Sequence, residues 1–238
     1  MGLVEYSAGN KEVCLLKVAV SWSGGKDSCM AYHQALAEGH EIQCIIVFIW
    51  EQPSPAHPLS VIELQAKAVE KDLFKAKVTE PYFEQYKQVI LQLVSEKGIE
   101  AIVTGDIAPV DAFHGNWMDN VCNGLNVKVL KPLWGLDRYE LLKSLIEGGY
   151  KAVFSCVKRP WFDDSWIGRE LDWESIRELK ALRQKYGIDL SGEYGEYHTL
   201  ILDAPFFKKK IEISKYEVEK SDKAFYMKVK EAFLKSKT

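Results

Sequence analysis

Residues 18–28 read Val-Ala-Val-Ser-Trp-Ser-Gly-Gly-Lys-Asp-Ser, and this stretch decides the predicted fold. The apolar run from Cys14 to Trp22 is typical of a strand that is buried on both faces. A glycine pair follows, and then a helical segment from Lys26 to Glu38 that ends at Gly39. A loop that leaves a buried strand and opens a helix lies where open parallel sheets bind ligands. The stretch therefore predicts a ligand loop at the carboxyl end of a parallel strand.

The residue types of this loop suit a phosphate group. Gly24 and Gly25 can take positive φ and present consecutive backbone N–H groups, which together form a nest for an anion. The helix that follows adds the positive end of its dipole, and Lys26 adds a point charge. Asp27 would repel a bare phosphate, so we expect it to hold Mg²⁺, and Ser28 offers a further donor. A glycine turn that only opens an ordinary helix is the alternative.

Strands and helices alternate through the first part of the chain. We predict strands at 14–22, 41–50, 76–79, 100–105 and 127–130. Helices are expected between them at 26–38, 60–69, 82–97 and, more weakly, up to Asn123, with Ser60 and Glu63 as a capping box. Elements that alternate in this way form parallel βαβ units. Residues 1–133 are therefore predicted to form a doubly wound, five-stranded parallel α/β sheet of Rossmann-like type.

Beyond Trp134 the rhythm of the sequence changes. We predict helices at 137–147, capped by Asp137, and at 173–186, with strands at 151–157, 197–202 and 210–214. The last stretch, 223–235, is predicted to be an amphipathic helix. Residues 134–238 would then form a second, smaller α/β domain. We expect the first domain to bind a nucleotide and the second to bind the other substrate.

The bulk composition is that of an ordinary globular protein, since 47% of the residues are hydrophobic and 27% are charged. The formal net charge of −3 does not indicate a nucleic-acid binder, which usually carries a basic surplus. The longest apolar stretch, 42–50, is too short to cross a bilayer, and no secretory signal is visible. The five cysteines are odd in number and form no C-x-x-C pair, so we expect reduced thiols in a cytoplasmic protein.

A second polar motif spans residues 192–199, Gly-Glu-Tyr-Gly-Glu-Tyr-His-Thr, directly before a predicted strand. Glu193 and Glu196 are three residues apart and separated by glycine, which would place both carboxylates on one rim of a tight turn. Such a pair could hold Mg²⁺, bind ammonium or orient a cationic substrate. A polar turn that leads into an edge strand is the alternative. Loops in this position often carry function, so we predict that both glutamates are catalytic.

The loop at 23–28 resembles that of the N-type ATP pyrophosphatases, the PP-loop superfamily, whose fold is of the adenine nucleotide α-hydrolase type. The resemblance implies that ATP is split to AMP and pyrophosphate, with Lys26 and Asp27 in catalytic roles. Together with the segments 104–107, 132–134 and 165–169, the second motif looks like the diphthine–ammonia ligase family. That resemblance extends to about Lys210. It implies ATP-dependent amidation, with ammonia, of the diphthine carboxylate on translation elongation factor 2.

Further residues are expected around the nucleotide. Gly105 would let the nucleotide approach the backbone, and Asp106 would bind ribose or Mg²⁺, with a helix N-cap as the alternative. The backbone at Val47 and Phe48 should lie near the adenine. Three more residues complete the predicted nucleotide site: Ser21, Ser23 and His57.

Two positions depart from the family's usual Glu-Gly-Gly-Glu-(Tyr/Phe)-Glu-Thr motif. Tyr194 stands for its first glycine, and a tyrosine would be strained at a left-handed position. His198 stands for its last glutamate, so the identity of the acceptor is left open. His114 and Trp117, on the weak helix, could line the acceptor side of the site.

Two other functions remain as alternatives at this point. A tRNA-thiolating enzyme would carry sulfur on a cysteine such as Cys122 or Cys156, although buried inert cysteines are commoner. A nucleotide sensor would keep the loop without turnover. The source of the ammonia and the oligomeric state are also open.

Overall fold

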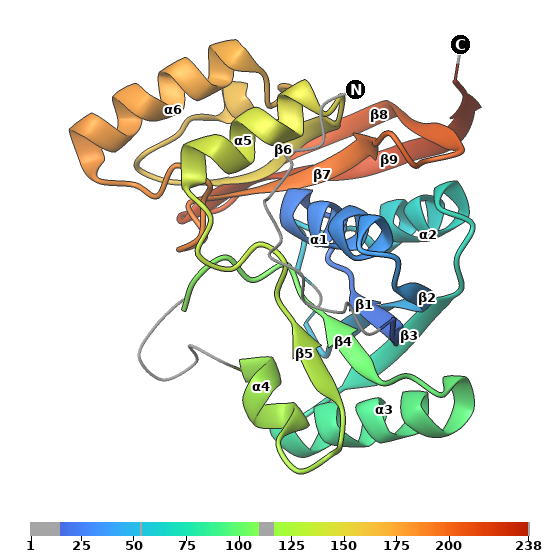
Figure 1. Cartoon of the computed structure of the whole chain (residues 1–238). Helices are drawn as coiled ribbons and strands as arrows, with labels where there is room; N and C mark the ends of the chain where they lie inside the picture. Colours follow the sequence, from blue (N-terminus) through green and yellow to red (C-terminus); the bar gives the residue numbers. More distant parts are fainter. Residues whose placement is uncertain (1–14, 53, 110–116, 238) are drawn as a thin grey trace. The chain divides into compact units, whose positions relative to one another are not determined.

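The computed structural model describes residues 15–52, 54–109 and 117–237 (Figure 1). These residues group into two compact units. Unit 1 comprises residues 15–22, 27–52, 71–109 and 117–134, and unit 2 comprises residues 23–26, 54–70 and 135–237. The loop segment 23–26 therefore groups with unit 2, although it directly follows the first strand of unit 1.

Unit 1 contains a five-stranded sheet in which all neighbouring strands are parallel. Its order is β3-β2-β1-β4-β5, and its strands are β1 (Lys17–Ser21), β2 (Glu41–Trp50), β3 (Leu73–Val78), β4 (Ala101–Val103) and β5 (Lys128–Leu130). The chain adds β2 and β3 on one side of β1 and then continues on the other side with β4. The order reverses between β1 and β4, and open sheets bind ligands at the carboxyl ends of such strands. The predicted parallel α/β fold is confirmed.

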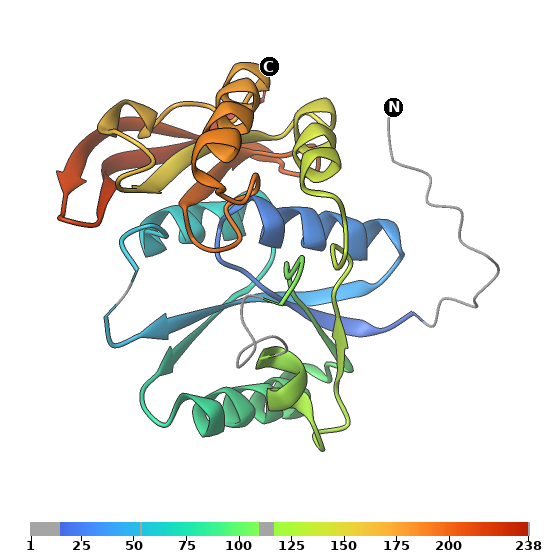
Figure 2. The same cartoon turned by 90° about the vertical axis from the view of Figure 1, so that its left-hand side faces the viewer.

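Helices cover both faces of this sheet (Figure 2). α3 (Tyr82–Lys97) and α4 (Trp117–Cys122) lie on one face, and α1 (Lys26–Ala37) lies on the other. The apolar side chains between the sheet and α3 form one buried cluster, in which Ile90 is fully buried. α1 and α3 match their predicted bounds to within one residue. Gly98, at φ +62°, ends α3 in the left-handed conformation that glycine tolerates best.

Unit 2 contains a four-stranded antiparallel sheet in the order β7-β6-β9-β8. The strands are β6 (Lys151–Lys158), β7 (Tyr197–Asp203), β8 (Lys209–Lys220) and β9 (Ala224–Ser236). The helices are α2 (Leu59–Ala68), α5 (Arg138–Glu147), the 3₁₀ turn η1 (Asp164–Trp166) and α6 (Trp173–Tyr186). α5 and α6 lie over one face of the sheet in Figure 1, and α2 packs against β8 and β9. β7 lies at the edge of this sheet, with β6 as its neighbour.

The predicted helix at 223–235 is wrong, because this segment forms β9. Ser221 makes the turn that precedes it: its N–H donates to the Ala224 oxygen (2.8 Å), and its Oγ accepts the Ala224 N–H (3.0 Å). Phe225 and Met227, two residues apart, are both buried, which is the period of a strand. The spaced lysines of the segment suggested a polar helix face. Pairing with β8 and β6 outweighs that weak local preference.

The predicted capping box of α2 is also wrong. Pro58 is the N-cap residue, and no side chain caps the helix, because Ser60 already lies inside its first turn. By contrast, Asp137 caps α5 as predicted and accepts the N–H groups of Tyr139 and Glu140. α6 has its predicted bounds. At the start of the chain, Cys14 lies outside the described residues.

Candidate active site

The loop after β1 bends at Gly24, which has φ +83° as its predicted turn requires. Gly25 does not lie in the left-handed region. A Cβ on Gly25 would come 3.2 Å from the backbone oxygen of Thr199, so a side chain at this position would crowd β7. The Gly25 N–H donates to Ser23 Oγ (3.3 Å). The two glycines therefore serve different purposes, one for backbone conformation and one for space.

Lys26 is buried although it carries a charge, with 4% of its surface exposed. Its backbone N–H donates to Thr199 Oγ1 (3.1 Å). Its Nζ lies 5.6 Å from the centre of the Tyr197 ring, within the range of a cation–π contact. Burial of a charge is costly, and this ring contact offsets part of that cost.

Unit 1 brings Asp27 and Ser28 beside Gly105. A Cβ on Gly105 would lie 2.7 Å from both the Asp27 carbonyl carbon and the Ser28 nitrogen. The end of β4 therefore passes directly against the first turn of α1, as expected at a switch point. Asp106 Oδ2 accepts a hydrogen bond from Thr104 Oγ1 (2.8 Å). No helix begins at residues 107–109, so within the described chain Asp106 is not a helix N-cap.

The predicted adenine contacts lie on β1 and β2. Ser21 ends β1 and pairs with Ile46 of β2. Val47 is buried, and the ring of Phe48 stacks on Tyr86 with 3.9 Å between the ring centres. The Phe48 side chain is thus committed to the core on the α3 face. A contact with adenine through backbone atoms, as the sequence suggests, stays a prediction.

In the second motif, Glu196 is buried and turns its carboxylate onto its own loop. Its Oε1 accepts the N–H of Asp189 (2.8 Å), and its Oε2 accepts the N–H of Tyr194 (3.0 Å). Both oxygens therefore have backbone partners within the loop. The catalytic role of Glu196 stays a prediction, as does that of Glu193.

Asp189 holds the same loop from its other end. Its Oδ1 accepts the N–H and the hydroxyl of Ser191 (2.8 and 2.9 Å) and the N–H of Glu193 (3.3 Å). Its Oδ2 accepts Arg138 Nε (3.1 Å). Burial alone would raise the pKa of Asp189, but these hydrogen bonds hold it below its ordinary value. The loop 189–196 is thus fixed by two of its own carboxylates.

Tyr194 fits this loop without strain. Gly192 and Gly195 take the left-handed turns, with φ of +77° and +76°, whereas Tyr194 does not have a positive φ. Its side chain is 60% exposed. The tyrosine at this position therefore leaves the backbone turn intact and adds an exposed aromatic side chain to the loop surface.

His198 lies beside His57, with 5.1 Å between the ring centres and the rings nearly perpendicular. Burial lowers the pKa of His57 to about 4, against a smaller opposing effect of the Ser23 backbone. Burial also lowers the pKa of His198 to about 3, helped by the nearby His57, Lys26 and Lys158. Both rings are therefore neutral near pH 7. The sequence predicted His57 at the nucleotide. In unit 2 it lies next to His198, the residue that stands for the last glutamate of the family motif.

Sequence reasoning missed three residues that fix the two loops: Asp189, Gln65 and Thr199. The order Asp-Leu-Ser-Gly at 189–192 is a turn signature that could have shown the first. Gln65 gave no signal, because a glutamine on an amphipathic helix usually faces solvent. His114 lies outside the described residues. Trp117 begins α4 and packs edge-on against Tyr86.

The described cysteines form no disulfide with one another and are all buried. Burial raises the pKa values of Cys44, Cys122 and Cys156 to about 11. Among the described residues, no group of three or more His, Cys, Asp or Glu side chains gathers to hold a metal ion. In the same part of the chain, no helix is both long and apolar enough to cross a membrane.

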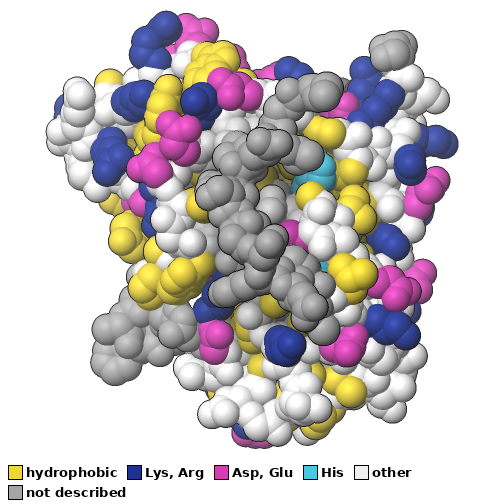
Figure 3. All heavy atoms as spheres, in the orientation of Figure 1, with side chains coloured by type: hydrophobic (Ala, Val, Ile, Leu, Met, Phe, Trp, Pro, Cys, Tyr) yellow, Lys and Arg dark blue, Asp and Glu magenta, His cyan; other side chains and the backbone are white. Residues whose placement is uncertain are grey.

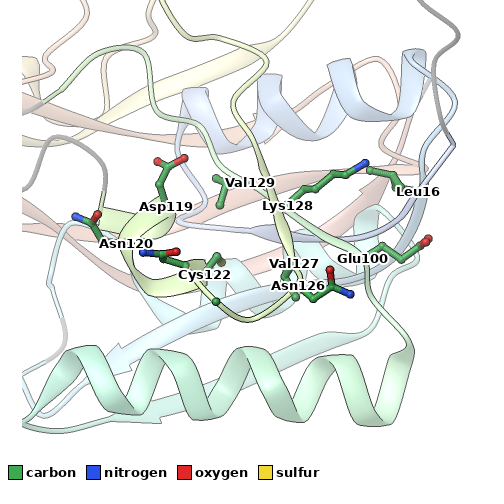
Figure 4. A pocket seen from close by; sticks show the side chains of 11 residues that line it. Leu16, Glu100, Asp119, Asn120, Cys122, Asn126, Val127, Lys128 and Val129 are labelled. Atoms are coloured by element: carbon green, nitrogen blue, oxygen red, sulfur yellow. The ribbon is translucent and has the colours of Figure 1, made fainter.

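A surface cavity of about 760 Å³ lies elsewhere in unit 1 (Figure 4). Glu100 and Lys128, which line it, lie at the amino ends of β4 and β5, whereas Gly105 follows the carboxyl end of β4. None of the predicted nucleotide-binding residues lines it. The cavity therefore does not mark the predicted site.

Comparisons with known proteins cover both parts of the chain. The family model for the diphthamide synthase N-terminal domain matches residues 16–129, and that for the C-terminal domain matches residues 137–234. The diphthine–ammonia ligase of Mus musculus is 31% identical over 230 residues, which cover 85% of this chain and 84% of the mouse protein. The Homo sapiens protein of the same name is 30% identical, with 85% of each chain covered. The Schizosaccharomyces pombe protein is 29% identical over 90% of this chain but only 39% of its own length.

Proposed function

Because the chain belongs to the diphthine–ammonia ligase family, we propose that it is an amide ligase that splits ATP to AMP and pyrophosphate at the loop 23–28. The observation that carries this proposal is the loop itself. A side chain would be crowded at either of its glycines, its lysine is buried, and it leaves β1 beside the switch point of a parallel sheet. This arrangement suits the polyphosphate of a nucleotide.

The loop would act on the leaving pyrophosphate. When the bond between the α- and β-phosphates breaks, negative charge grows on the leaving group. The Lys26 ammonium and the N–H groups at the start of α1 would stabilise that charge from fixed positions, without the cost of ordering at the moment of reaction. Ser23 and Ser28 would supply further donors, with Ser21, His57, Gly105 and Asp106 around the rest of the nucleotide.

Mg²⁺ would be held by Asp27 together with phosphate oxygens of ATP. Sites of this kind use one or two carboxylates plus the substrate phosphates. Asp27 lies in the first turn of α1, where the close approach of Gly105 fixes its backbone. The ion would neutralise phosphate charge during the displacement.

We propose that a carboxylate oxygen of the acceptor, diphthine on elongation factor 2, displaces pyrophosphate from the α-phosphate of ATP. In the second half-reaction ammonia attacks the carbonyl carbon of this adenylate, the C–O bond to AMP breaks, and the nitrogen loses a proton to give the amide. Residues 1–133 would serve the nucleotide, and residues 134–238 would serve the acceptor. We propose catalytic roles for both Glu193 and Glu196, and both oxygens of Glu196 accept backbone N–H groups of its own loop. His198 would then present a neutral imidazole where relatives of the motif have a carboxylate.

The described residues favour this function over tRNA thiolation. With pKa values of about 11, Cys122 and Cys156 stay protonated near pH 7 and are poor nucleophiles. The face of unit 2 around α5 and α6 mixes charges of both signs rather than forming a basic stripe (Figure 3). The pair of Arg177 and Glu174 on α6 is an example. We also propose a cytoplasmic location, because the described cysteines form no disulfide with one another.

The proposal is tested with the full chain, MgATP, ammonium and elongation factor 2 that carries diphthine. We expect AMP and pyrophosphate in equal amounts, separated by chromatography, and conversion of the acceptor to its amide by mass spectrometry. ADP as the main product would contradict the ATP chemistry. AMP formation without amidation of this acceptor would contradict only the acceptor.

A further inference from the structure

The free edge of β7 is closed by the nucleotide loop. One side of β7 pairs with β6. On its other side, the Ile201 N–H donates to the Gly24 oxygen (3.0 Å), and the Ile201 oxygen accepts a hydrogen bond from Gln65 Nε2 (2.8 Å). An edge strand without such partners would leave these backbone groups unsatisfied or open to another chain. The loop therefore takes the place of a fifth strand at this edge.

Gln65 joins the loop to β7. It lies on α2, has no exposed surface, and donates from Nε2 to both the Gly24 oxygen (2.9 Å) and the Ile201 oxygen (2.8 Å). An amide nitrogen carries two hydrogens, so both are used. A Cβ on Gly24 would come 2.7 Å from Gln65 Oε1, which leaves no room for any other residue at that turn. Gln65 thus joins a backbone carbonyl of the loop to a backbone carbonyl of β7.

Thr199 fixes the loop at a second point. Its Oγ1 accepts the Lys26 N–H (3.1 Å), and its hydroxyl and backbone oxygen are both buried against the loop. Thr199 and Ile201 are two residues apart and so face the same edge and side of β7. The loop is consequently held at its first glycine and at its lysine, with Gly25 between them.

Because the peptide unit is planar, the contacts of the Gly24 carbonyl also set the direction of the Gly25 N–H. A trans peptide is planar, so its C=O and N–H groups point in opposite directions. Because Gln65 and Ile201 hold the Gly24 carbonyl on the β7 side, the Gly25 N–H must point away from β7, where it meets Ser23 Oγ. The next N–H group, that of Lys26, points to Thr199 Oγ1 on β7, so the backbone orientation of the turn is fixed on both sides before a ligand arrives.

We propose that Gln65 and Thr199 are positioning residues that hold residues 24–26 in the conformation that binds pyrophosphate. Neither side chain needs to touch the nucleotide. They act by fixing the Gly24 carbonyl and the Lys26 N–H. This inference rests on the proposed function for its effect on ATP, but the backbone conformation itself can be measured without ATP.

The test uses two pairs of variants of the full chain. Gln65→Met keeps the side-chain length and removes both donors, with Gln92→Met on α3 as the matched control, because Gln92 is exposed and bonds only Glu96 among the described contacts. Thr199→Val keeps the shape and removes the hydroxyl, whereas Thr199→Ser keeps the hydroxyl and serves as the rescue. Each variant is assayed for amide hydrogen exchange without ATP and for AMP formation with MgATP.

We expect the amides of Lys26 and Ile201 to exchange about ten-fold faster or more in Gln65→Met, and that of Lys26 to do so in Thr199→Val. kcat/KM for ATP should fall about ten-fold in both, at a temperature where each variant is folded. Thr199→Ser and Gln92→Met should behave like the wild type. A residue that only stabilised the fold would lower the melting temperature and leave kcat/KM per folded molecule unchanged.

The inference is overturned if Gln65→Met and Thr199→Val keep wild-type exchange at Lys26 and wild-type kcat/KM. If Gln65→Met does not fold, the comparison of Thr199→Val with Thr199→Ser decides. A wild-type protein that forms no AMP would instead refute the proposed function, while the exchange data would still show whether these two residues hold the loop.

Discussion

The two glycine-bent loops of this protein are fixed in opposite ways. The loop 23–26 is held by groups from elsewhere in the chain, chiefly Gln65 and Thr199. The loop 189–196 is held by its own carboxylates, Asp189 and Glu196. A loop held from outside needs no carboxylate of its own to set its shape, whereas a loop held from inside commits its acidic groups to backbone N–H donors. The two loops therefore reach a fixed shape by different routes, and only the second uses its own carboxylates to do so.

The largest expected effect is on the first loop. Asp27→Asn should lower Mg²⁺-dependent AMP formation by about 10²-fold or more, because the neutral amide holds the ion and its phosphates poorly. The melting temperature should stay within a few degrees of the wild type, since asparagine keeps the size and shape of aspartate. AMP formation and thermal unfolding are measured on the same preparation. Unchanged AMP production would remove Asp27 from the mechanism.

The second loop should show the reverse behaviour. Glu196→Ala leaves two partly buried N–H groups without their acceptor, so the free energy of unfolding should drop by about 1–2 kcal/mol. Glu193→Ala, at a partly exposed position, should lower the free energy of unfolding by less and serves as the matched control. Urea unfolding measures both. If the Glu196→Ala protein is as stable as the wild type but has a reduced kcat, Glu196 is a catalytic residue. The view that its carboxylate serves to fix the loop 189–196 is then wrong.

A smaller effect is expected from Gly24→Ala, which tests whether the first loop really is crowded from outside. The alanine must adopt φ near +83°, which costs about 1–2 kcal/mol, and its Cβ also meets the pinned Gln65 amide. Gly187→Ala is the control, because Gly187 has φ +73° but nothing within 4 Å of a Cβ. AMP formation should fall about ten-fold more in Gly24→Ala than in Gly187→Ala. Equal losses would mean that crowding plays no part.

The smallest expected effect concerns pH and the histidine pair. His57 and His198 have folded-state pKa values of about 4 and about 3, well below their ordinary value. Below about pH 6.5 the unfolded chain binds protons that the folded chain does not, so the free energy of unfolding is highest above that pH and falls as pH drops towards 4. A His57→Gln, His198→Gln double variant should show a flatter decline between pH 7 and 5 in thermal unfolding. If the stability of both proteins depends on pH with the same slope, these rings are solvated and their pKa values are not lowered by burial.

The sequence predicted those features that depend on neighbouring residues. The period of apolar residues set the bounds of α3 and α6, and the Asp137 cap set the start of α5. The loop 23–28 could be placed because a strand, two glycines and a helix follow one another directly. β9 could not be predicted in this way, since its lysines allow a helix and its strand pairing depends on residues far away.

The same limit explains the candidate site. The sequence shows that Glu193 and Glu196 are close, but not that Glu196 turns inward to the N–H groups of Asp189 and Tyr194. Gln65 is an ordinary polar residue in sequence, and its role follows from its position between Gly24 and Ile201. Chemistry-bearing residue types can be recognised in a sequence, whereas the residues that orient them are recognised only in the folded chain.

The hydrogen bond between Lys26 and Thr199 joins positions 173 residues apart. On the ribosome, the Ser-Gly-Gly-Lys segment is made well before the strand that fixes it. Contacts of such high sequence separation form late, after the entropy of closing a long loop has been overcome. A nascent chain therefore contains the sequence of the loop 23–28 long before that loop can adopt its folded conformation. Under the proposed function, ATP binding would require β7 to be in place, and a chain interrupted before Thr199 would lack this contact.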